Sequence, residues 1–438
     1  MDIYSTYSVK IKHYNRIFLQ SVEQYRKAVD FFINVCMKEW EVLGTVSGVR
    51  SVNAIEGLTV RTKKRPEVRY DFSKAFYKFP SYLRRSAIAE AYGKVSSYMS
   101  LLSNYKSGSA TGKPGFPKAG RIYPALYRDN CYVRLDDHTA QIKVYVRNTW
   151  DWLKVSLNKG DVDYILRHCS NRKECSPTLQ KRGKEWFLDF PFQEKIMLKK
   201  KDVKDQTILA VDLGMNSACV CAAMKSDGTV IGREFLHLPV EKDHLTKSLN
   251  RIKKAQQHGN RRTPRLWAKA KGHNDDIAVK TAAFIMEQAK KYQADVIVFE
   301  HLELKGKKSG SKKQKLHLWK AQYVQSMVTG KAHRSGIHIS RINAWGTSRL
   351  AYDGSGFTRR GKEAELNSYS LCRFQNGKVY NCDLNAAYNI GARYYIREIT
   401  KSLPETERLE AEAKVPQCSK RSTCTLSTLI SLNAVMTA

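Results

Sequence analysis

Two apolar stretches, Thr207-Ile-Leu-Ala-Val-Asp212 and Asp295-Val-Ile-Val-Phe-Glu300, decide the fold class of the second half of the chain. Each is a short continuous run rich in apolar residues, which is typical of a strand buried on both faces of a sheet. Around them the pattern predicts three strands, helices, a strand, a helix, a strand near 337–342 and a final helix. Residues 207–398 are therefore predicted to form an α/β domain with a mixed sheet.

Each run ends in an acid, and a third acid opens the last predicted helix. Asp212 and Glu300 end their strands, and Asp383 starts the sequence Asp383-Leu-Asn-Ala-Ala-Tyr-Asn-Ile390. If the two strands are parallel neighbours, Asp212 and Glu300 leave the sheet at one edge, where a helix N-terminus can bring Asp383. Three adjacent carboxylates repel unless cations neutralise them, so the pattern favours a Mg²⁺ or Mn²⁺ site suited to phosphodiester hydrolysis. Taken singly, Asp383 could be only a helix cap and the other two only strand ends.

The composition indicates a polyanionic partner. The 438 residues include 76 Lys and Arg against 41 Asp and Glu, a formal net charge of +35. Positive charges in such excess repel one another within a compact chain, and there are more of them than solubility requires. The alternative to a polyanionic partner is a generally basic surface. No stretch approaches the roughly 20 apolar residues of a membrane span, and the start lacks a secretory signal pattern. We therefore expect a cytoplasmic protein without a membrane partner.

The first half of the chain predicts a small β-barrel interrupted by helices. Residues 3–11 alternate like a strand, and short alternating runs return between about 128 and 192. Between them, apolar residues recur at helical spacing over 18–43 and 83–102, and small polar residues with glycines at 107–112 indicate a linker. The helices would thus be an insertion between the first strand and the rest of the barrel.

Three motifs resemble the RuvC-like motifs of the transposon-encoded TnpB nucleases and of compact type V CRISPR effectors. They are Ala210-Val-Asp-Leu-Gly-Met-Asn216, Ile297-Val-Phe-Glu-His-Leu302 and Asp383-Leu-Asn-Ala-Ala-Tyr-Asn-Ile390. Pro114-Gly-Phe-Pro117, followed by 133–137, is similar to the segment that leads into the family's wedge barrel. The resemblance covers nearly the whole chain and is strongest in the second half.

This resemblance implies a fold class and a division into domains. We expect a multidomain α+β protein with an N-terminal wedge-type β-barrel, an inserted helical recognition domain and a C-terminal α/β RuvC-like (ribonuclease-H-like) nuclease domain. The barrel would comprise residues 1–12 and 107–200, the recognition domain 13–106, the nuclease domain 201–342 and 383–400, a target-nucleic-acid-binding insertion 343–382, and a C-terminal tail 401–438.

The resemblance also implies an activity and its partners. The family's function would make this chain an RNA-guided DNA endonuclease in which Asp212, Glu300 and Asp383 hold Mg²⁺ or Mn²⁺ and catalyse cleavage. Its partners would be a structured guide RNA, a double-stranded target DNA and the displaced single strand, with base pairing supplying sequence specificity. It would be cytoplasmic and associated with the nucleoid when bound to DNA. Two alternatives remain: an RNA-guided repressor with weak or no cleavage, and a junction nuclease that needs no RNA.

One departure from the family lies between the second and third acids, where a four-cysteine zinc site usually begins Thr-Ser-x-x-Cys-x-x-Cys. Here Thr347-Ser348 is followed by Ala351 and Gly354 at the first two cysteine positions, and only Cys372 and Cys382 remain nearer Asp383. Alanine and glycine cannot bind a metal through a side chain. We therefore expect no structural zinc. The segment would be ordered by aromatic packing, or would stay disordered until nucleic acid binds. The aromatic residues expected to pack are Trp345, Tyr352, Phe357, Tyr369, Phe374 and Tyr380.

Basic segments supply the candidate nucleic-acid contacts. Residues 247–271 are expected to form a helical hairpin against the guide–target duplex, with a solvated charged face as the alternative, and 305–315 to act as a lid over the substrate strand. The outer faces of the N-terminal helices, with Arg84 and Arg85, could hold a nucleic-acid backbone. The candidate residues are Arg251, Lys253, Lys254, Arg261, Arg262, Arg265, Trp267, Lys307, Lys308, Arg359 and Arg360.

Overall fold

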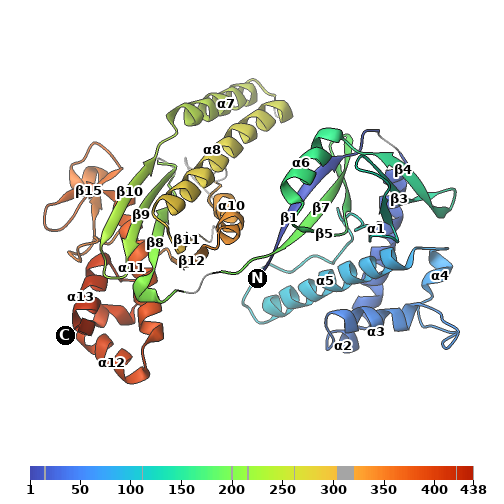
Figure 1. Cartoon of the computed structure of the whole chain (residues 1–438), viewed down its shortest axis with the longest axis horizontal. Helices are drawn as coiled ribbons and strands as arrows, with labels where there is room; N and C mark the ends of the chain where they lie inside the picture. The colour runs from blue at the N-terminus through green and yellow to red at the C-terminus, as the bar shows by residue number, and fades with distance from the viewer. Residues whose placement is uncertain are drawn as a thin grey trace. The chain divides into compact units, whose positions relative to one another are not determined.

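The computed structural model of the chain contains two compact units, residues 2–195 and residues 196–438 together with Met1 (Figure 1). No helix among the described residues is long and apolar enough to cross a membrane. The predicted assignment of the chain to five domains stays a prediction, because contacts alone divide it only into these two units. The structure describes every residue except 14–15, 111, 199–200, 215–216, 261, 303–319, 421 and 438.

Two small antiparallel sheets form the β part of the first unit. In one, β7 pairs with β1 on one side and with β5 and β6 on the other, and in the other the order is β2-β3-β4. A bridge between Ile11 and Leu157 links the chain after β1 to the chain after β4. The pairing of the N-terminal strand with β7 agrees with the alternation of its residues, whereas a single barrel stays a prediction. The strands are β1 (Asp2–Lys10), β2 (Tyr132–Arg134), β3 (Thr139–Val146), β4 (Thr149–Ser156), β5 (Lys173–Glu174), β6 (Thr178–Arg182) and β7 (Glu185–Lys195).

The helices of this unit include the two that the apolar spacing predicts. The first is broken at Glu39 into α1 and α2, and the second is α5. Helix α6 was not expected, because its apolar residues Val162, Ile165 and Cys169 lie in a region whose alternation suggested strands. The helices are α1 (Ile17–Lys38), α2 (Trp40–Leu43), α3 (Val49–Thr59), α4 (Phe72–Ala75), α5 (Ser81–Lys106) and α6 (Lys159–Cys169).

Helices and sheets of the first unit share one apolar core. The buried rings of Phe18 on α1 and Trp186 on β7 lie with centroids 5.4 Å apart in an edge-to-face contact. The hydroxyls of Tyr25 and Ser86 hydrogen bond over 2.9 Å and join α1 to α5. The helices therefore pack as part of the same unit as the strands.

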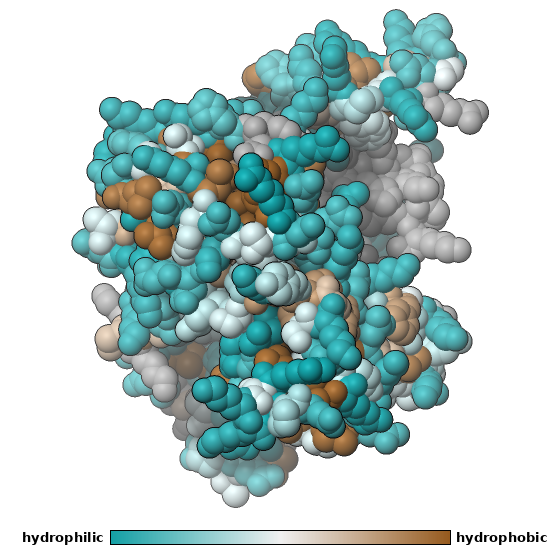
Figure 2. All heavy atoms as spheres, turned by 90° about the vertical axis from the view of Figure 1, so that its right-hand side faces the viewer, coloured by the Kyte–Doolittle hydropathy of each residue, from teal (hydrophilic) through white to brown (hydrophobic). Residues whose placement is uncertain are grey.

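The surface seen in Figure 2 is mostly hydrophilic, with apolar side chains in separate groups.

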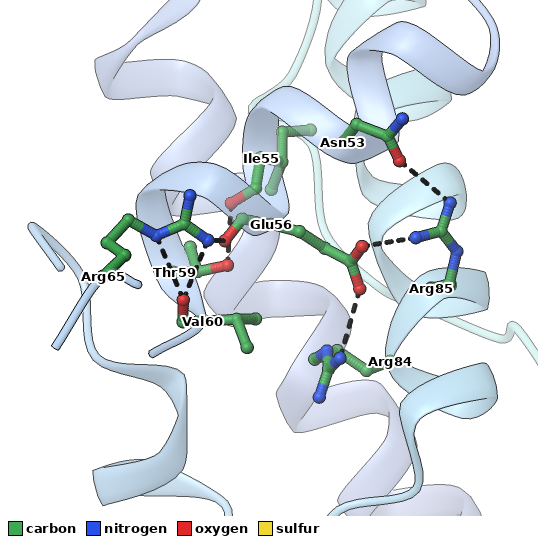
Figure 3. A network of polar contacts seen from close by, with 8 residues as sticks. All are labelled: Asn53, Ile55, Glu56, Thr59, Val60, Arg65, Arg84 and Arg85. Atoms are coloured by element: carbon green, nitrogen blue, oxygen red, sulfur yellow. Dashed lines mark hydrogen bonds and ion pairs between the residues drawn. The ribbon is translucent and has the colours of Figure 1, made fainter. Parts of the chain in front are cut away.

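An ion-pair network fastens α3 to α5 in this unit (Figure 3). The carboxylate of Glu56 accepts hydrogen bonds from Arg84 Nη2 over 3.2 Å and from Arg85 Nη1, and Arg85 Nη2 also donates to Asn53 Oδ1 over 3.1 Å. Arg65 Nη2 donates to the backbone carbonyls of Glu56 and Val60. Arg84 and Arg85, expected on a face open to nucleic acid, are thus already bound to a carboxylate of the chain.

The second unit contains the mixed sheet that the two apolar runs predict. Its order is β10-β9-β8-β11-β12, in which β11 runs parallel to both β8 and β12, while β9 is antiparallel to β8 and β10. The prediction of an α/β domain with a mixed sheet is confirmed. The strands are β8 (Thr207–Asp212), β9 (Cys219–Lys225), β10 (Val230–Leu236), β11 (Val296–His301) and β12 (His338–Asn343).

Helices cover both faces of this sheet. Ile208 and Ala210 pack with α11, and Leu209 and Val211 pack with α8 and α10, so alternate residues of β8 fill two cores. Gly391 allows α11 to approach the sheet, because a Cβ there would lie 2.4 Å from the sulfur of Met224. The helices are α7 (Pro239–Gln257), α8 (Pro264–Lys291), α10 (Ala321–Arg334), α11 (Cys382–Ser402), α12 (Glu405–Lys414) and α13 (Leu426–Thr437), with short 3₁₀ turns η1 (Val203–Asp205) and η3 (Pro416–Ser419).

Aromatic packing orders the insertion between β12 and α11 in part as expected. The ring of Tyr352 contacts those of Phe374, Tyr380 and Tyr388 at centroid distances of 5.6, 5.1 and 5.3 Å. In contrast, three other aromatic residues expected to contribute, Trp345, Phe357 and Tyr369, are exposed. The insertion contains a small sheet of β13 (Arg359–Arg360), β14 (Leu371–Arg373) and β15 (Val379–Asn381), and the 3₁₀ turn η2 (Gly361–Ala364).

The C-terminal tail packs into the second unit, a role that its sequence pattern did not reveal. Leu426, Leu429 and Leu432 of α13 are buried in the core that also contains α11. The backbone N–H of Ser427 donates to the Tyr352 carbonyl over 2.9 Å, so the tail also contacts the segment in which the zinc cysteines are missing. Tail contacts therefore add to the aromatic packing that orders this segment.

Candidate functional site

Asp212 and Glu300 lie at the same edge of the sheet. In the parallel register of β8 and β11, Phe299 is opposite Val211, so the next residues of the two strands are Glu300 and Asp212. The expectation that the two strands are parallel neighbours is confirmed. Because parallel strands end at a common edge, both carboxylates lie beyond the apolar core, and each is half-buried.

Asp383 is the second residue of α11 and does not cap the helix. The cap is Asn381, whose Oδ1 accepts the backbone N–H groups of Asp383 and Leu384 over 3.0 and 2.9 Å. The alternative in which Asp383 is only a helix cap is therefore wrong. Its Oδ2 would lie 3.7 Å from a Cβ built on Gly214, two residues after Asp212, which places the carboxylate against the loop that follows β8.

The carboxylates of Glu300 and Asp383 disfavour the ionised form of Asp212. Burial raises the pKa of Asp212 well above its usual range, and the charges of Glu300 and Asp383 add to this. Among the described residues, the charge of Arg360 opposes the change. Burial also raises the pKa of Glu300, against a hydrogen bond from Thr347 and the charge of Arg393. Among the described residues, negative charge is thus concentrated at the sheet edge beyond what the neighbouring cations neutralise, and a bound cation would relieve this repulsion.

The donor set fits a hard divalent cation, although the side chains do not yet converge on one point. Carboxylate oxygens are the ligands that Mg²⁺ and Mn²⁺ prefer, and no Cys or His belongs to the set. Among the described residues, no group of three or more His, Cys, Asp or Glu side chains is arranged to hold a metal ion. The charges of the site therefore favour a cation, and binding one would require the carboxylates to move closer together.

Two residues that the sequence analysis missed hold Glu300. Gln325 of α10 donates through Nε2 to the Glu300 backbone carbonyl over 2.9 Å, and its Oε1 accepts from Arg341 over 3.2 Å. Thr347 Oγ1 donates to Oε1 of the Glu300 carboxylate. The Thr347-Ser348 motif was the available signal, but it was interpreted only as the lead into a lost zinc site.

Buried polar residues at every fourth position of α11 hold the turn that carries Thr347. The side-chain amides of Asn385 and Asn389 donate to the Leu350 carbonyl over 2.9 and 2.8 Å, and Asn389 also donates to the Thr347 carbonyl over 2.9 Å. Arg393 continues the series. Its guanidinium donates to the backbone carbonyls of Asn343, Trp345, Ser422 and Cys424.

Besides Arg393, two cationic side chains approach the carboxylates. Lys242 of α7 is half-buried, and burial lowers its pKa while the charge of Asp383 works against that change. Arg360 of β13 donates to the Ser348 carbonyl and lowers the pKa of Asp212. Arg360 was a candidate from the sequence, whereas Lys242 was not distinguished from the other lysines of its charged helix.

The predicted hairpin of basic residues exists as α7 and α8, which pack side by side (Figure 1). An ion pair between Lys280 and Glu241, 2.7 Å long, joins them. The candidate cations in the hairpin form no ion pair with any described acid. Arg251, Lys253, Lys254, Arg262 and Arg265 are exposed and Trp267 is half-buried, while Arg261, Lys307 and Lys308 lie outside the described residues.

A second cationic feature lies in the insertion. Arg359 is directly opposite Arg373 in the β13–β14 ladder. Like charges at opposed positions destabilise a sheet, and Arg373 Nε is buried without a hydrogen-bond partner among the described residues. The pair is therefore suited to an anion, and Arg373 joins the candidates that the sequence analysis missed.

Comparison with known proteins identifies relatives of this chain. Residues 5–146 match the model of the Aq_aa04 family. The uncharacterized protein aq_aa04 of Aquifex aeolicus (strain VF5) is 34% identical over 131 residues, 26% of this chain and 72% of that protein. The fold resembles the cryo-EM structure of Cas12f1 in its complex with sgRNA and target DNA, with a TM-score of 0.55 and 14% identity over 85% of this chain and 81% of that one.

The relative that decides the family is the TnpB-like protein aq_aa05 of Aquifex aeolicus (strain VF5). It is 30% identical over 241 residues, which are 49% of this chain and 76% of that protein. The chain therefore belongs to the TnpB-like protein family.

Proposed function

We propose that this protein is an RNA-guided DNA endonuclease that hydrolyses phosphodiester bonds at a site built from Asp212, Glu300 and Asp383. The observation that carries the proposal is the meeting of two strand ends and one helix start at a single sheet edge. Family membership and the likeness to the fold of Cas12f1, solved with sgRNA and target DNA, support it. The net charge of +35 suits a protein that binds this much phosphate.

The second unit would be the nuclease part. Residues 201–342 and 383–400 would form a RuvC-like (ribonuclease-H-like) domain, which is supported by three antiparallel strands followed by two parallel ones with helices on both faces. Residues 343–382 would be its target-nucleic-acid-binding insertion, without the zinc cysteines. The first unit would supply the wedge barrel and the helical recognition domain.

Asp212, Glu300 and Asp383 would hold Mg²⁺ or Mn²⁺, which supplies an activated water and neutralises charge on the scissile phosphate. Arg360 and Lys242 approach the same carboxylates, so their cationic groups can bind the phosphate oxygens beside them. Gln325 and Thr347 hold Glu300 at its backbone and its carboxylate. These residues together orient a substrate strand over the acids.

The exposed cations of α7 and α8 would contact the backbone of the guide–target duplex. They have no acid partner among the described residues, and phosphate contacts position a duplex without reading its sequence. Arg359 and Arg373 would bind the substrate strand near the insertion. Sequence specificity would come from base pairing of the guide.

The test is to sequence the RNA that copurifies with the full chain and to assay cleavage of a matching DNA duplex. We expect cleavage that requires this RNA and a divalent cation, and that is lost in excess EDTA. Cleavage that survives removal of all RNA would instead identify a junction nuclease.

A second candidate, an RNA-guided DNA-binding protein without cleavage, is favoured by one observation. No described group of three acids, histidines or cysteines is arranged to hold a metal ion. RNA-dependent binding of the matching duplex without cleavage at any Mg²⁺ or Mn²⁺ concentration would identify this function.

A further inference from the structure

The hydroxyl of Thr347 is a hydrogen-bond donor placed against one oxygen of Glu300. The side chain is buried, with 2% of its surface exposed, and Oγ1 donates to Glu300 Oε1. The same hydroxyl lies 3.1 Å from the Ala344 carbonyl, so its need for an acceptor would be met without Glu300. Because a carboxylate is the stronger acceptor, the single hydroxyl proton is directed to Glu300.

The donor is rigid because its backbone is held. Arg393 binds the Trp345 carbonyl over 2.7 Å, and Asn389 binds the Thr347 carbonyl itself. Threonine is branched at Cβ, so its side chain has little freedom once the backbone is fixed. Burying a guanidinium here is costly, since burial lowers the pKa of Arg393 to about 10, yet four backbone carbonyls satisfy it. The turn is thus held in place from α11, the helix that also carries Asp383.

Among the described residues, one oxygen of the Glu300 carboxylate accepts a hydrogen bond and the other does not. Oε1 accepts the Thr347 hydroxyl, whereas Oε2 accepts no hydrogen bond from a described residue. A carboxylate fixed in this way has one oxygen left for another ligand, and hydrogen bonds to ligating carboxylates usually change metal affinity or activity by about 10- to 100-fold.

We propose that Thr347 is a positioning residue for Glu300, whose carboxylate it holds by Oε1 so that Oε2 is presented to a divalent cation. The inference rests on the proposed function, because it assumes that Glu300 binds such a cation. It adds a role for the Thr-Ser motif that does not depend on zinc.

The experiment compares Thr347→Val, which keeps the shape and removes the hydroxyl, with Thr347→Ser, which keeps the hydroxyl. The matched control is Thr281→Val, because Thr281 is also 2% exposed but donates to the Ile277 carbonyl within α8. Two quantities are measured on the full chain: Mn²⁺ binding to the RNA-free protein by titration calorimetry, and the Mg²⁺ concentration that gives half-maximal cleavage with RNA bound.

We expect Thr347→Val to weaken Mn²⁺ binding about tenfold and to raise the half-maximal Mg²⁺ concentration similarly, while Thr347→Ser and Thr281→Val stay within about twofold of the parent. In a Glu300→Gln background, Thr347→Val should have no further effect on Mn²⁺ binding. A folded Thr347→Val protein with parental values would overturn the inference. If that variant does not fold, Thr347→Ala and Thr347→Ser differ only in the hydroxyl and are compared instead, with the same expected difference.

The outcomes separate this inference from the proposed function. A parent protein that binds Mn²⁺ through Asp212 but cleaves no DNA contradicts the proposed function, and Thr347 is then judged from Mn²⁺ binding alone. A parent protein that neither binds Mn²⁺ nor cleaves DNA contradicts both.

Discussion

Glu56 in the first unit and Asp212 in the second are both partly buried acids, yet the chain surrounds them with opposite charges. The carboxylate of Glu56 lies between the guanidinium groups of Arg84 and Arg85, which join α3 to α5 (Figure 3). Among the described residues, Asp212 faces the carboxylates of Glu300 and Asp383 and one opposing guanidinium, that of Arg360. The first arrangement stabilises the fold, whereas the second is costly to the protein alone.

This difference separates a structural acid from a functional one. A buried charge is tolerated when it is paired within the chain, and removing its partner destabilises the fold. Acids that remain uncompensated after folding depend on a charge from outside the chain. The two regions should therefore respond in opposite ways to loss of a carboxylate.

The largest expected effect is the loss of cleavage when one of the three acids is removed. Asp212→Ala, Glu300→Ala and Asp383→Ala should each abolish RNA-dependent DNA cleavage, because the cation site loses a ligand. Binding of RNA and DNA should remain nearly parental, since the basic surface is unchanged. Gel-based cleavage and filter-binding assays measure the two quantities. Full cleavage by Asp212→Ala would contradict the assignment of the site.

The next effect concerns the hairpin cations that have no acid partner among the described residues. Replacing Arg251, Lys253 and Lys254 together by Gln should weaken nucleic-acid binding and reduce the slope of log affinity against log salt by about 1 for each phosphate that the protein no longer neutralises. Fluorescence anisotropy over a range of salt concentrations measures this slope. Lys280→Gln is the matched control, because Lys280 is paired with Glu241 and Asp276. Equal slopes for the triple variant and the control would show that the hairpin does not bind phosphate.

Loss of the paired acid should cost stability without removing activity. Glu56→Gln leaves two partly buried guanidinium groups without their carboxylate, so we expect the free energy of unfolding to fall by about 1 to 2 kcal/mol, less than for a fully buried pair. Denaturant unfolding measures this change, and cleavage assayed at a temperature where the variant is folded should stay near the parental rate. An unchanged stability would show that the network in Figure 3 is not structural.

The smallest expected effect is a gain in stability when the charge of Asp212 is removed. Asp212→Asn removes one of three repelling charges, so the free energy of unfolding without divalent cations should rise by about 0.5 to 1 kcal/mol, the size of a charge interaction at a partly exposed site. Added Mg²⁺ should stabilise the parent protein but not this variant. A fall in stability would show that the negative charge of Asp212 is compensated by groups of the protein itself.

Much of the second unit could be predicted from sequence because its signals are local. The continuous apolar runs of β8 and β11 and the alternation of β12 identified the strands, and the acids at their ends followed from position alone. The insertion was harder, because β13, β14 and β15 have two or three residues each, too few for a periodic pattern. Helix α13 in the tail was missed because its apolar residues can be recognised as core residues only once they are seen to pack against α11.

The sequence by itself determined the strands of the mixed sheet, the longest helices, the excess of positive charge and the three acids, because each depends on residue types close together along the chain. Only the tertiary structure decided which charges are compensated. Arg84 meets Glu56 across 28 positions, and Thr347 meets Glu300 across 47. Contacts across such separations depend on how strands and helices pack against one another, so they cannot be predicted from a local sequence pattern. The roles of Asn381, Thr347 and Arg393 around the acids were for this reason visible only in the folded chain.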